Sequence, residues 1–522
     1  MQPEPSAGKG RKYLSEPYEA VLLLVAILSR GFHYLYYLLS ESSRIFYWPV
    51  LGAYRFEAAA ELMLSGGVPR GPFVYAGPLF QYVVLPFYAT GMGRELLFAF
   101  NSLCGIFLAW LIYRSCRLCG TGRVWSLLIG LAWVLYAPAL FYELTPLPVT
   151  FLTLTVALFV WLVMRQGEKA PAGTRSFLYG LLGGVLAGLR PPFAAVVMVP
   201  FLRLLKSRRL LRAGLLVAGV AVPVLFLCSE QKRRGKDFWP FPRSAGLNLL
   251  LGHNSDATGY GPPVPSEGLV ESPGEDIHQV ALRVARERGY EGPSEADRYW
   301  MGRALEWIVE HPQKEVELIL RKMGGFFGAK PFDTYYDQSR VNRFGSPMRL
   351  AFMPRWGLMG IFLLGLVPFC LAGRRRVLLL LPVGLALAAN VAFVHSERYF
   401  LPILPQMLVV GGSGLGIVAG RLRKGRWKWL GVALSGLALA VPSALYPVPQ
   451  IAEEAYLYGL AVRAYNMGNH REALSIYERA AMSAEEGTAV YFQAHGEAAR
   501  IARALGMDEK AREHERALGG NL

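Results

Sequence analysis

Long apolar runs constrain the fold of this chain more than any other feature. The run VLLLVAILS begins at Val21, and the run VLLLLPVGLALAANVAFV begins at Val377. A bilayer-spanning helix needs about 20 mostly apolar residues, so these runs supply part or most of a span. A helix on a soluble core would carry a polar face, which these runs lack. Since 53% of the residues are hydrophobic and only 18% are charged, the sequence predicts an all-α polytopic membrane protein.

The formal net charge of +17 reflects how Lys and Arg are placed between the apolar runs. The basic clusters are GKGRK near the N-terminus, RSCR from Arg114, RQGEK from Arg165, KSRRLLR from Lys206, GRRR from Gly373 and RLRKGRWK from Arg421. This distribution is typical of cytoplasmic loops under the positive-inside rule. We therefore interpret the charge as a determinant of topology and expect no nucleic-acid partner.

Fixing these clusters in the cytoplasm predicts a bundle of about 11 spans, with the N-terminus inside and the C-terminus outside. The predicted spans lie at about 18–39, 95–113, 123–141, 146–164, 176–205 (a hairpin of two short halves with Arg190 at its tip), 212–228, 353–372, 376–394, 399–420 and 427–446. The predicted outer loops are about 40–92 and about 229–350. The cluster QKRRGK from Gln231 falls outside, in a long loop, where such charge is better tolerated.

The ends of the chain divide it into three predicted parts: a cytoplasmic tail at 1–17, a transmembrane domain at 18–450 and a helical tail at 451–522. The first span is not followed by a small-residue cleavage site, so we expect it to be retained. The last part fits the tetratricopeptide pattern, in which small and large packing positions alternate at Leu457, Leu460, Ala461, Ala464, Gly468, Ala473, Tyr477 and Ala480. Such arrays usually need about three units. We expect two units to dock on the membrane domain or on a protein partner.

Six short motifs lie in or beside the predicted outer loops. They are Pro49 to Ala53 with the helix that ends at Ser65-Gly66-Gly67, Gly77 to Tyr82, Phe141-Tyr142-Glu143, GLLGGVLAGLRP from Gly180 to Pro191, Gly252-His253-Asn254 with Gly259-Tyr260, and Glu397 to Pro402. Together with the layout of residues 18–420, they resemble bacterial GT-C glycosyltransferases of the family-39, protein-mannosyltransferase-like type, in the subgroup with C-terminal tetratricopeptide repeats. The resemblance implies a GT-C-type transmembrane bundle.

The resemblance also implies a location, a substrate and a set of binding residues. Such enzymes lie in the bacterial cytoplasmic (inner) membrane, with the active site on the periplasmic or extracellular side, and take a sugar from a polyprenyl-phosphate lipid. An interfacial Arg is costly unless it is paired, so Arg190 and Arg398 are candidates for the donor phosphate. Tyr399 and His395 lie beside Arg398, and His253, Asn254 and Tyr260 would form a substrate loop.

The reaction needs a base, because the acceptor hydroxyl must lose its proton. The Asp that supplies a carboxylate in the family aligns with Gly52 here. The remaining candidates are Glu143, which matches a second acidic position of the family, and Glu57 and Glu61, which are four residues apart on one helix face. No metal is required by the sequence, although a divalent ion is left open. Cys116 and Cys119 form a CxxC without further ligands nearby, which we interpret as apolar packing.

Because glycine stands at position 52, where the family has Asp, functions other than sugar transfer are left open. The chain could be a catalytically impaired membrane scaffold or a protein that binds the carrier lipid. An O-antigen ligase or polymerase also has many spans and a large outer loop, but the Pro-Leu-x-x-Tyr of the first outer loop argues against that class. A transporter would need a paired acid and base in the middle of a span, and we expect none.

Overall fold

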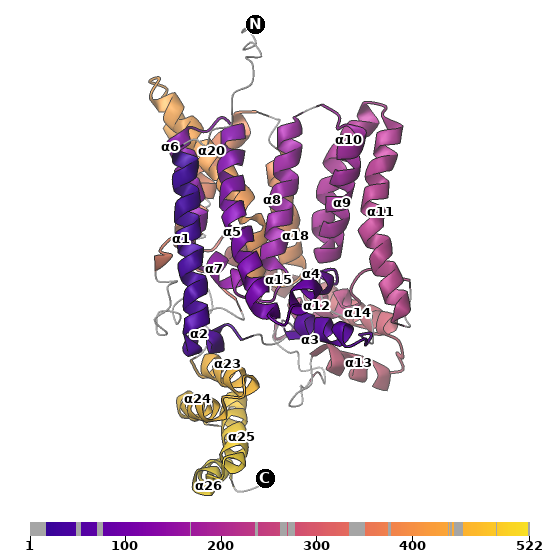
Figure 1. Cartoon of the computed structure of the whole chain (residues 1–522), viewed down its shortest axis with the longest axis vertical. Helices are drawn as coiled ribbons and strands as arrows, with labels where there is room; N and C mark the ends of the chain where they lie inside the picture. Colours follow the sequence, from indigo (N-terminus) through magenta and orange to yellow (C-terminus); the bar gives the residue numbers. More distant parts are fainter. Residues whose placement is uncertain are drawn as a thin grey trace.

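The computed structural model describes residues 17–48, 54–69, 77–167, 169–234, 238–261, 269, 277–333, 350–373, 377–436, 438, 441–442, 453–486 and 488–519. Every secondary-structure element among them is a helix, and the longer helices run side by side as a bundle (Figure 1). Two isolated backbone bridges, Tyr136 with Phe352 and Tyr260 with His395, are the extended pairings found in these ranges. The predicted all-α class is confirmed.

The bundle contains helices that are long and apolar enough to cross a membrane. Within the described residues there are five, namely α1 (Pro17–Leu39), α5 (Gly93–Leu118), α8 (Val149–Gln166), α11 (Leu210–Arg233) and the continuous segment Glu397–Leu422. That segment comprises α19 (Glu397–Phe400), the 3-10 helix η6 (Leu401–Ile403) and α20 (Leu404–Leu422). Shorter apolar helices are α6 (Arg123–Val134), α17 (Arg355–Leu371) and α18 (Val377–Ala392). The helices fit a membrane protein, but the count of about eleven spans is not confirmed.

The predicted span at 123–141 is two helices, so that prediction is wrong. Helix α6 ends at Val134, and α7 (Ala137–Glu143) begins after Tyr136, whose backbone is extended. Pro138 lies in the first turn of α7 and has no backbone N–H, so it cannot donate to the carbonyl of Val134 as a continuous helix would require. The carbonyl of Val134 instead accepts a hydrogen bond from the side chain of Arg30 at 3.0 Å, and that of Leu135 accepts from the backbone N–H of Met353 at 3.0 Å.

The predicted hairpin is present, and Arg190 stands at its turn. Helix α9 (Gly173–Leu189) is followed by the 3-10 helix η2 (Pro191–Val197) and by α10 (Met198–Lys206). Arg190 is extended because the following Pro191 disfavours helical backbone before it. A Cβ at Gly180 would overlap the backbone carbonyl of Leu216, so α9 and α11 pack with their backbones close together, as small residues allow in membranes.

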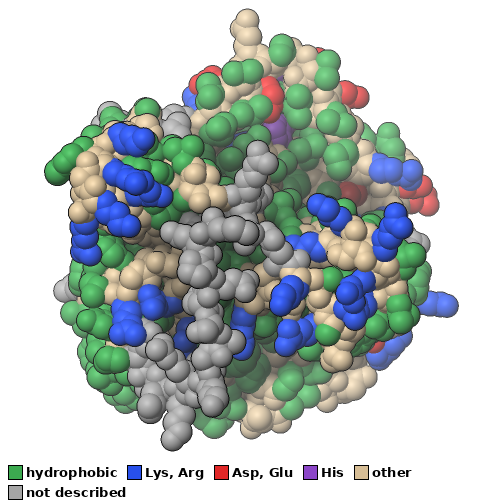
Figure 2. All heavy atoms as spheres, turned by 90° about the horizontal axis from the view of Figure 1, so that it is seen from above, with side chains coloured by type: hydrophobic (Ala, Val, Ile, Leu, Met, Phe, Trp, Pro, Cys, Tyr) green, Lys and Arg blue, Asp and Glu red, His purple; other side chains and the backbone are tan. Residues whose placement is uncertain are grey.

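Basic side chains gather at one end of the bundle. Figure 2 looks onto this end, where Lys and Arg outnumber Asp and Glu. The C-terminal ends of α5, α8, α10 and α20 carry basic residues in their last turns, and Arg123 begins α6. The arginines of GRRR and all of GKGRK lie outside the described residues. The common position of the other clusters is what the positive-inside rule requires of one side of a membrane.

The opposite end of the bundle carries shorter helices (Figure 1). They are α2 (Glu41–Phe46), α3 (Tyr54–Leu64), α4 (Phe80–Tyr88), α12 (Ala245–Gly252), α13 (Ile277–Glu287), α14 (Pro293–Glu310) and α15 (Pro312–Phe327). Helices α12 to α14 have an apolar core of their own, which includes Leu250, Val284 and Trp300. This end therefore holds a small folded layer rather than loops alone.

The C-terminal helices lie at the same end as α2 (Figure 1). They are α23 (Glu453–Asn466), α24 (His470–Ser483), α25 (Ala489–Ala504) and α26 (Asp508–Ala517). Seven of the eight predicted packing residues are buried, and Gly468 instead turns the chain with φ +81°. The side chain of Asn469 donates to Glu41 at 3.1 Å, so the tail contacts α2. Membership of the tetratricopeptide class stays a prediction.

Candidate functional site

Two arginines from distant parts of the chain meet at one tyrosine. The guanidinium carbon of Arg190 lies 3.9 Å from the ring centre of Tyr399, and that of Arg398 lies 5.0 Å from the same ring. All three side chains are half-buried. We call Arg190, Arg398 and Tyr399 the arginine pair site. All three were predicted to bind the donor phosphate, and the structure brings them together.

The first outer loop packs directly against the hairpin turn that carries Arg190. The backbone N–H of Leu79 donates to the carbonyl of Gly188 at 3.2 Å. A Cβ at Gly188 would lie 2.9 Å from the Cβ of Leu79, so this approach needs a glycine. Gly77 has φ +88°, a conformation that favours glycine, and it lies against Pro148. Two of the six motifs are therefore in contact beside the arginine pair site.

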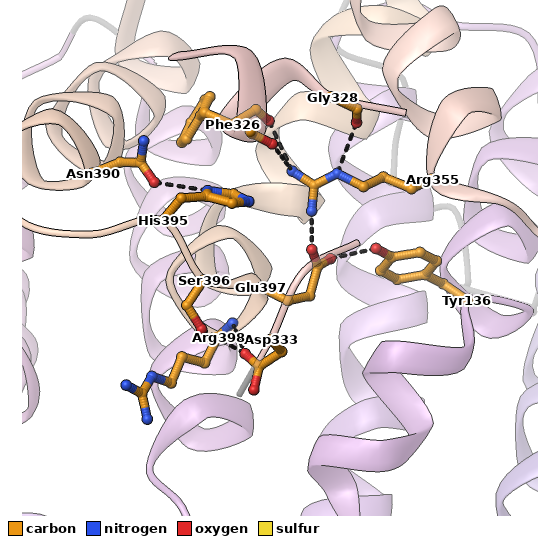
Figure 3. Close-up of polar contacts among 11 residues, drawn as sticks. Tyr136, Phe326, Gly328, Asp333, Arg355, Asn390, His395, Ser396, Glu397 and Arg398 are labelled. Carbon is orange, nitrogen blue, oxygen red and sulfur yellow. Dashed lines mark hydrogen bonds and ion pairs between the residues drawn. The ribbon is translucent and has the colours of Figure 1, made fainter. Parts of the chain in front are cut away.

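Asp333 holds the short helix that presents Arg398. Its carboxylate accepts hydrogen bonds from the hydroxyl of Ser396 at 2.6 Å and from the backbone N–H of Arg398 at 3.1 Å (Figure 3). The backbone N–H of Glu397 donates to Phe332 at 2.8 Å. A carboxylate at this position satisfies the free N–H groups of a helix start. In Figure 3 the side chain of Arg398 extends away from this network.

Glu397 is occupied by a buried network that sequence reasoning missed. Its carboxylate accepts from Arg355 and from the hydroxyl of Tyr136 (Figure 3), and neither Glu397 nor Arg355 is appreciably exposed. The remaining N–H groups of Arg355 donate to the carbonyls of Gly325, Phe326 and Gly328 at 3.1, 2.8 and 3.0 Å. A buried guanidinium with this many partners joins α15, α17 and α19, which is a structural role.

His395 lies in the interior, next to the substrate loop. Its Nδ1 is 2.8 Å from the side-chain oxygen of Asn390 (Figure 3), and its ring packs edge-on against Tyr260 at 5.6 Å. The backbone of His395 pairs with Gly259 and Gly261. Burial, together with the charge of Arg355, lowers the pKa of His395 well below its ordinary value. The ring is therefore neutral, and His395 would bring no positive charge to a phosphate.

The other predicted loop residues also belong to a buried polar cluster. His253 Nδ1 lies 2.7 Å from the carboxylate of Glu315, and its Nε2 lies 3.0 Å from Nζ of Lys322. Asn254 donates to the carbonyl of Leu250 at 2.8 Å. Burial lowers the pKa of Lys322 to about 8, against the opposing charge of Glu315. Glu315 and Lys322 were not predicted, because they lie more than 60 positions from His253.

The two carboxylates of α3 differ in their surroundings. Glu57 is buried and accepts hydrogen bonds from Nε and from a terminal nitrogen of Arg94, both at 2.9 Å, and from the hydroxyl of Tyr88. Glu61 is exposed. Gly52, where the family's Asp aligns, lies outside the described residues. The pairing with Arg94 and Tyr88 gives Glu57 a structural contact at the junction of α3, α4 and α5.

Glu143 is buried in the bundle with one paired and one unpaired oxygen. Its Oε1 accepts from Arg30 at 3.0 Å, while Oε2 has no hydrogen-bond partner among the described residues. A Cβ at Gly105 would overlap this carboxylate, so the glycine makes room for it. Arg30 lies near the middle of α1 and was missed, because the sequence shows no acid near it. The pair joins α1, a candidate span, to α7, which is not one, so the absence of a paired acid and base in the middle of a span stays a prediction.

No metal site is apparent in the part of the chain that the structure describes: no group of three or more His, Cys, Asp or Glu there could hold a metal ion. Cys116 and Cys119 are buried as free thiols.

Comparison with known proteins adds no assignment, because neither a family model nor a curated protein matches the chain.

Proposed function

We propose that this protein transfers a sugar from a polyprenyl-phosphate lipid to an acceptor at the outer face of the bacterial cytoplasmic membrane. The observation that carries the proposal is the arginine pair site. Arg190 comes from the α9 hairpin and Arg398 from the start of the Glu397–Leu422 segment, yet both guanidinium groups contact Tyr399. Two guanidinium groups that converge at the outer end of the bundle are suited to an anionic ligand such as a lipid phosphate.

The chemistry of the donor matches this arrangement. The lipid phosphate is an anion with several acceptor oxygens, and a guanidinium binds phosphate with two parallel hydrogen bonds. Burial, and to a smaller extent the charge of Arg398, lowers the pKa of Arg190, so a phosphate beside both arginines would stabilise the charged form of Arg190. The same contacts would stabilise the phosphate as it leaves with the electron pair of the broken sugar–oxygen bond.

Glu143 is the proposed base of an inverting, single-displacement reaction. In this step the acceptor hydroxyl loses its proton to a carboxylate, its oxygen bonds to the anomeric carbon and the phosphate leaves. Glu143 offers one unpaired carboxylate oxygen, whereas both oxygens of Glu57 are already paired. Because Glu143 is buried, the acceptor would reach it only after α7 or α1 moves. Glu57 or Glu61 is the alternative base if α7 does not open.

The direct test is transfer of a labelled hexose from a polyprenyl-phosphate-hexose by the purified full chain, with membrane fractions as the source of acceptor. Arg190→Ala and Arg398→Ala should each lower the rate at limiting donor by about tenfold or more, as loss of one charged hydrogen-bond donor to phosphate implies. Arg426→Ala is the matched control, because Arg426 is exposed at the basic end. Transfer rates in Arg190→Ala and Arg398→Ala that equal the rate of the Arg426→Ala control would overturn the assignment of the arginine pair site to the donor phosphate.

A second candidate is a carrier-lipid-binding scaffold without catalysis. It is favoured by Gly52 and by the burial and pairing of Glu57 and Glu143 with arginines. This candidate uses the same arginine pair site. It predicts that the lipid binds while no hexose is transferred, and that Glu143→Gln leaves lipid binding unchanged.

A further inference from the structure

The layer formed by α12 to α14 carries an open groove on its surface. The groove encloses about 560 Å³, within the range of about 300–1,000 Å³ common for small-molecule sites. It is lined by Gly289, Tyr290 and α14 residues between Glu295 and Glu306. None of these residues belongs to the arginine pair site.

The floor of the groove is fixed by the core beneath it. Trp300 is buried, and its indole N–H donates to the carbonyl of Ala281 at 3.2 Å, which holds α14 on α13. Gly289 has φ +91° and turns the chain at the end of α13. The turn places the ring of Tyr290 at 4.7 Å from the ring of Tyr299, with 31° between their planes. The groove is thus preformed rather than made by a loose loop.

The α14 wall of the groove combines donors and acceptors without net charge. Glu295, Arg298, Arg303 and Glu306 line it, and their spacing of three to five residues places them on neighbouring turns of one helix side. Arg303 donates to Glu306 at 2.8 Å. Two arginines balanced by two glutamates suit neither a polyanion nor an apolar chain. They suit hydroxyl groups, which donate to carboxylates and accept from guanidinium groups.

Gly302 keeps the middle of the wall open. A Cβ at this position would meet nothing within 4 Å. The space therefore lies between the charged side chains and beside the tyrosine rings. Tyr290 is 39% exposed, so a ligand could reach its ring from solvent. Aromatic side chains combine a large apolar surface with a polar group, which suits a ligand with apolar ring faces and hydroxyl edges.

We propose that this groove binds a neutral oligosaccharide, with a sugar ring against the exposed Tyr290 and hydroxyl groups hydrogen-bonded to the α14 wall. The proposal rests on the proposed function at one point: the bound oligosaccharide would be the acceptor or the product of sugar transfer. Binding itself requires no catalysis.

The test measures binding to the full chain in nanodiscs of neutral lipid. Saturation-transfer NMR would be recorded with maltotetraose, chitotetraose and mannotetraose, and with tetragalacturonate as an anionic comparator. At least one neutral tetrasaccharide should bind, and tetragalacturonate should bind more weakly. Gly302→Leu should fill the groove and weaken binding by about tenfold or more. Tyr290→Ala should also weaken it.

Gly496→Leu is the matched control, because Gly496 is also helical and a Cβ there meets nothing within 4 Å. It should bind as the wild type does. The proposal is overturned if no neutral tetrasaccharide binds the wild type, if tetragalacturonate binds more tightly, or if Gly302→Leu and Tyr290→Ala leave binding unchanged.

Failure here is distinguishable from failure of the proposed function. Arg398→Ala should lower the rate of hexose transfer at limiting donor by about tenfold or more and leave oligosaccharide binding intact. Transfer activity without oligosaccharide binding would refute only the proposal that the groove binds an oligosaccharide. Oligosaccharide binding without any transfer would refute only the proposed transferase function.

Discussion

At the residue scale, the interior of the bundle is set by a few charged side chains whose partners lie far away in the sequence. Arg30 meets Glu143, Arg355 meets Glu397, and Lys322 meets His253. Breaking a buried pair by removing one partner leaves an uncompensated charge, which is strongly destabilising. Such residues are therefore expected to control stability as well as any chemistry.

The glycine that accommodates Glu143 gives the first prediction. Gly105→Ala would place a methyl group on the carboxylate, and the resulting crowding should lower the free energy of unfolding by about 1–3 kcal/mol. Gly214→Ala is the control, since Gly214 lies within α11 and a Cβ there meets nothing within 4 Å. Thermal unfolding in detergent measures both. A Gly105→Ala variant as stable as Gly214→Ala would show that the Arg30–Glu143 contact is not tightly packed.

Lys322 gives a prediction about pH. Its folded pKa of about 8 lies below the ordinary 10.5, so between these values the unfolded chain binds the proton more tightly. The free energy of unfolding should therefore rise with pH across this window, by on the order of 3 kcal/mol from this group. Lys322→Met should lack that rise.

The measurement is the difference in unfolding free energy between the wild type and Lys322→Met at several pH values from 7 to 11. Subtraction removes the titration of groups that both proteins share. A difference that stays constant across the range would contradict the lowered pKa of Lys322.

At the element scale, the short helix α19 is positioned by a residue outside it. Asp333→Ala should remove the acceptor for Ser396 and for the N–H of Arg398, at a cost of about 1 kcal/mol in stability. It should also raise the KM for the lipid donor, because Arg398 would lose its fixed backbone. Asp333→Asn keeps an acceptor oxygen and should restore most of the affinity. Equal KM values in wild type and Asp333→Ala would remove Asp333 from the site.

Sequence patterns predicted the elements better than their junctions. The hairpin turn at Arg190 was predicted because Pro191 disfavours helical backbone before it, a local effect. The break at Tyr136 is explained by Pro138, which has no N–H for the carbonyl of Val134, but the apolar run through 123–141 suggested one span. Arg190, Arg398 and Tyr399 were found through their motifs. The sequence did not identify four further residues of the buried networks, namely Arg30, Lys322, Asp333 and Arg355. Their partners lie in distant segments, and such contacts produce no recognisable spacing in the sequence.

At the scale of the whole molecule, one end is basic and the other carries short helices and the C-terminal tail (Figures 1 and 2). The groove lies on α14, one of the helices at that second end. This polarity predicts which end faces the cytoplasm. In a background without the five native cysteines, Arg426→Cys should react with a membrane-impermeant maleimide only after cells are permeabilised. Met482→Cys, which is 78% exposed on α24 as Met, should react in intact cells. The reverse pattern would invert the proposed topology.

The central claim is that Arg190 and Arg398 together bind a polyprenyl phosphate. The most direct measurement is mass spectrometry of lipids that co-purify with the wild type, with Arg190→Ala, with Arg398→Ala and with the control Arg426→Ala. We expect a polyprenyl-phosphate species in the wild type and the control, and its loss from both site variants. Retention of that lipid in both site variants, or its absence from the wild type, would contradict the account.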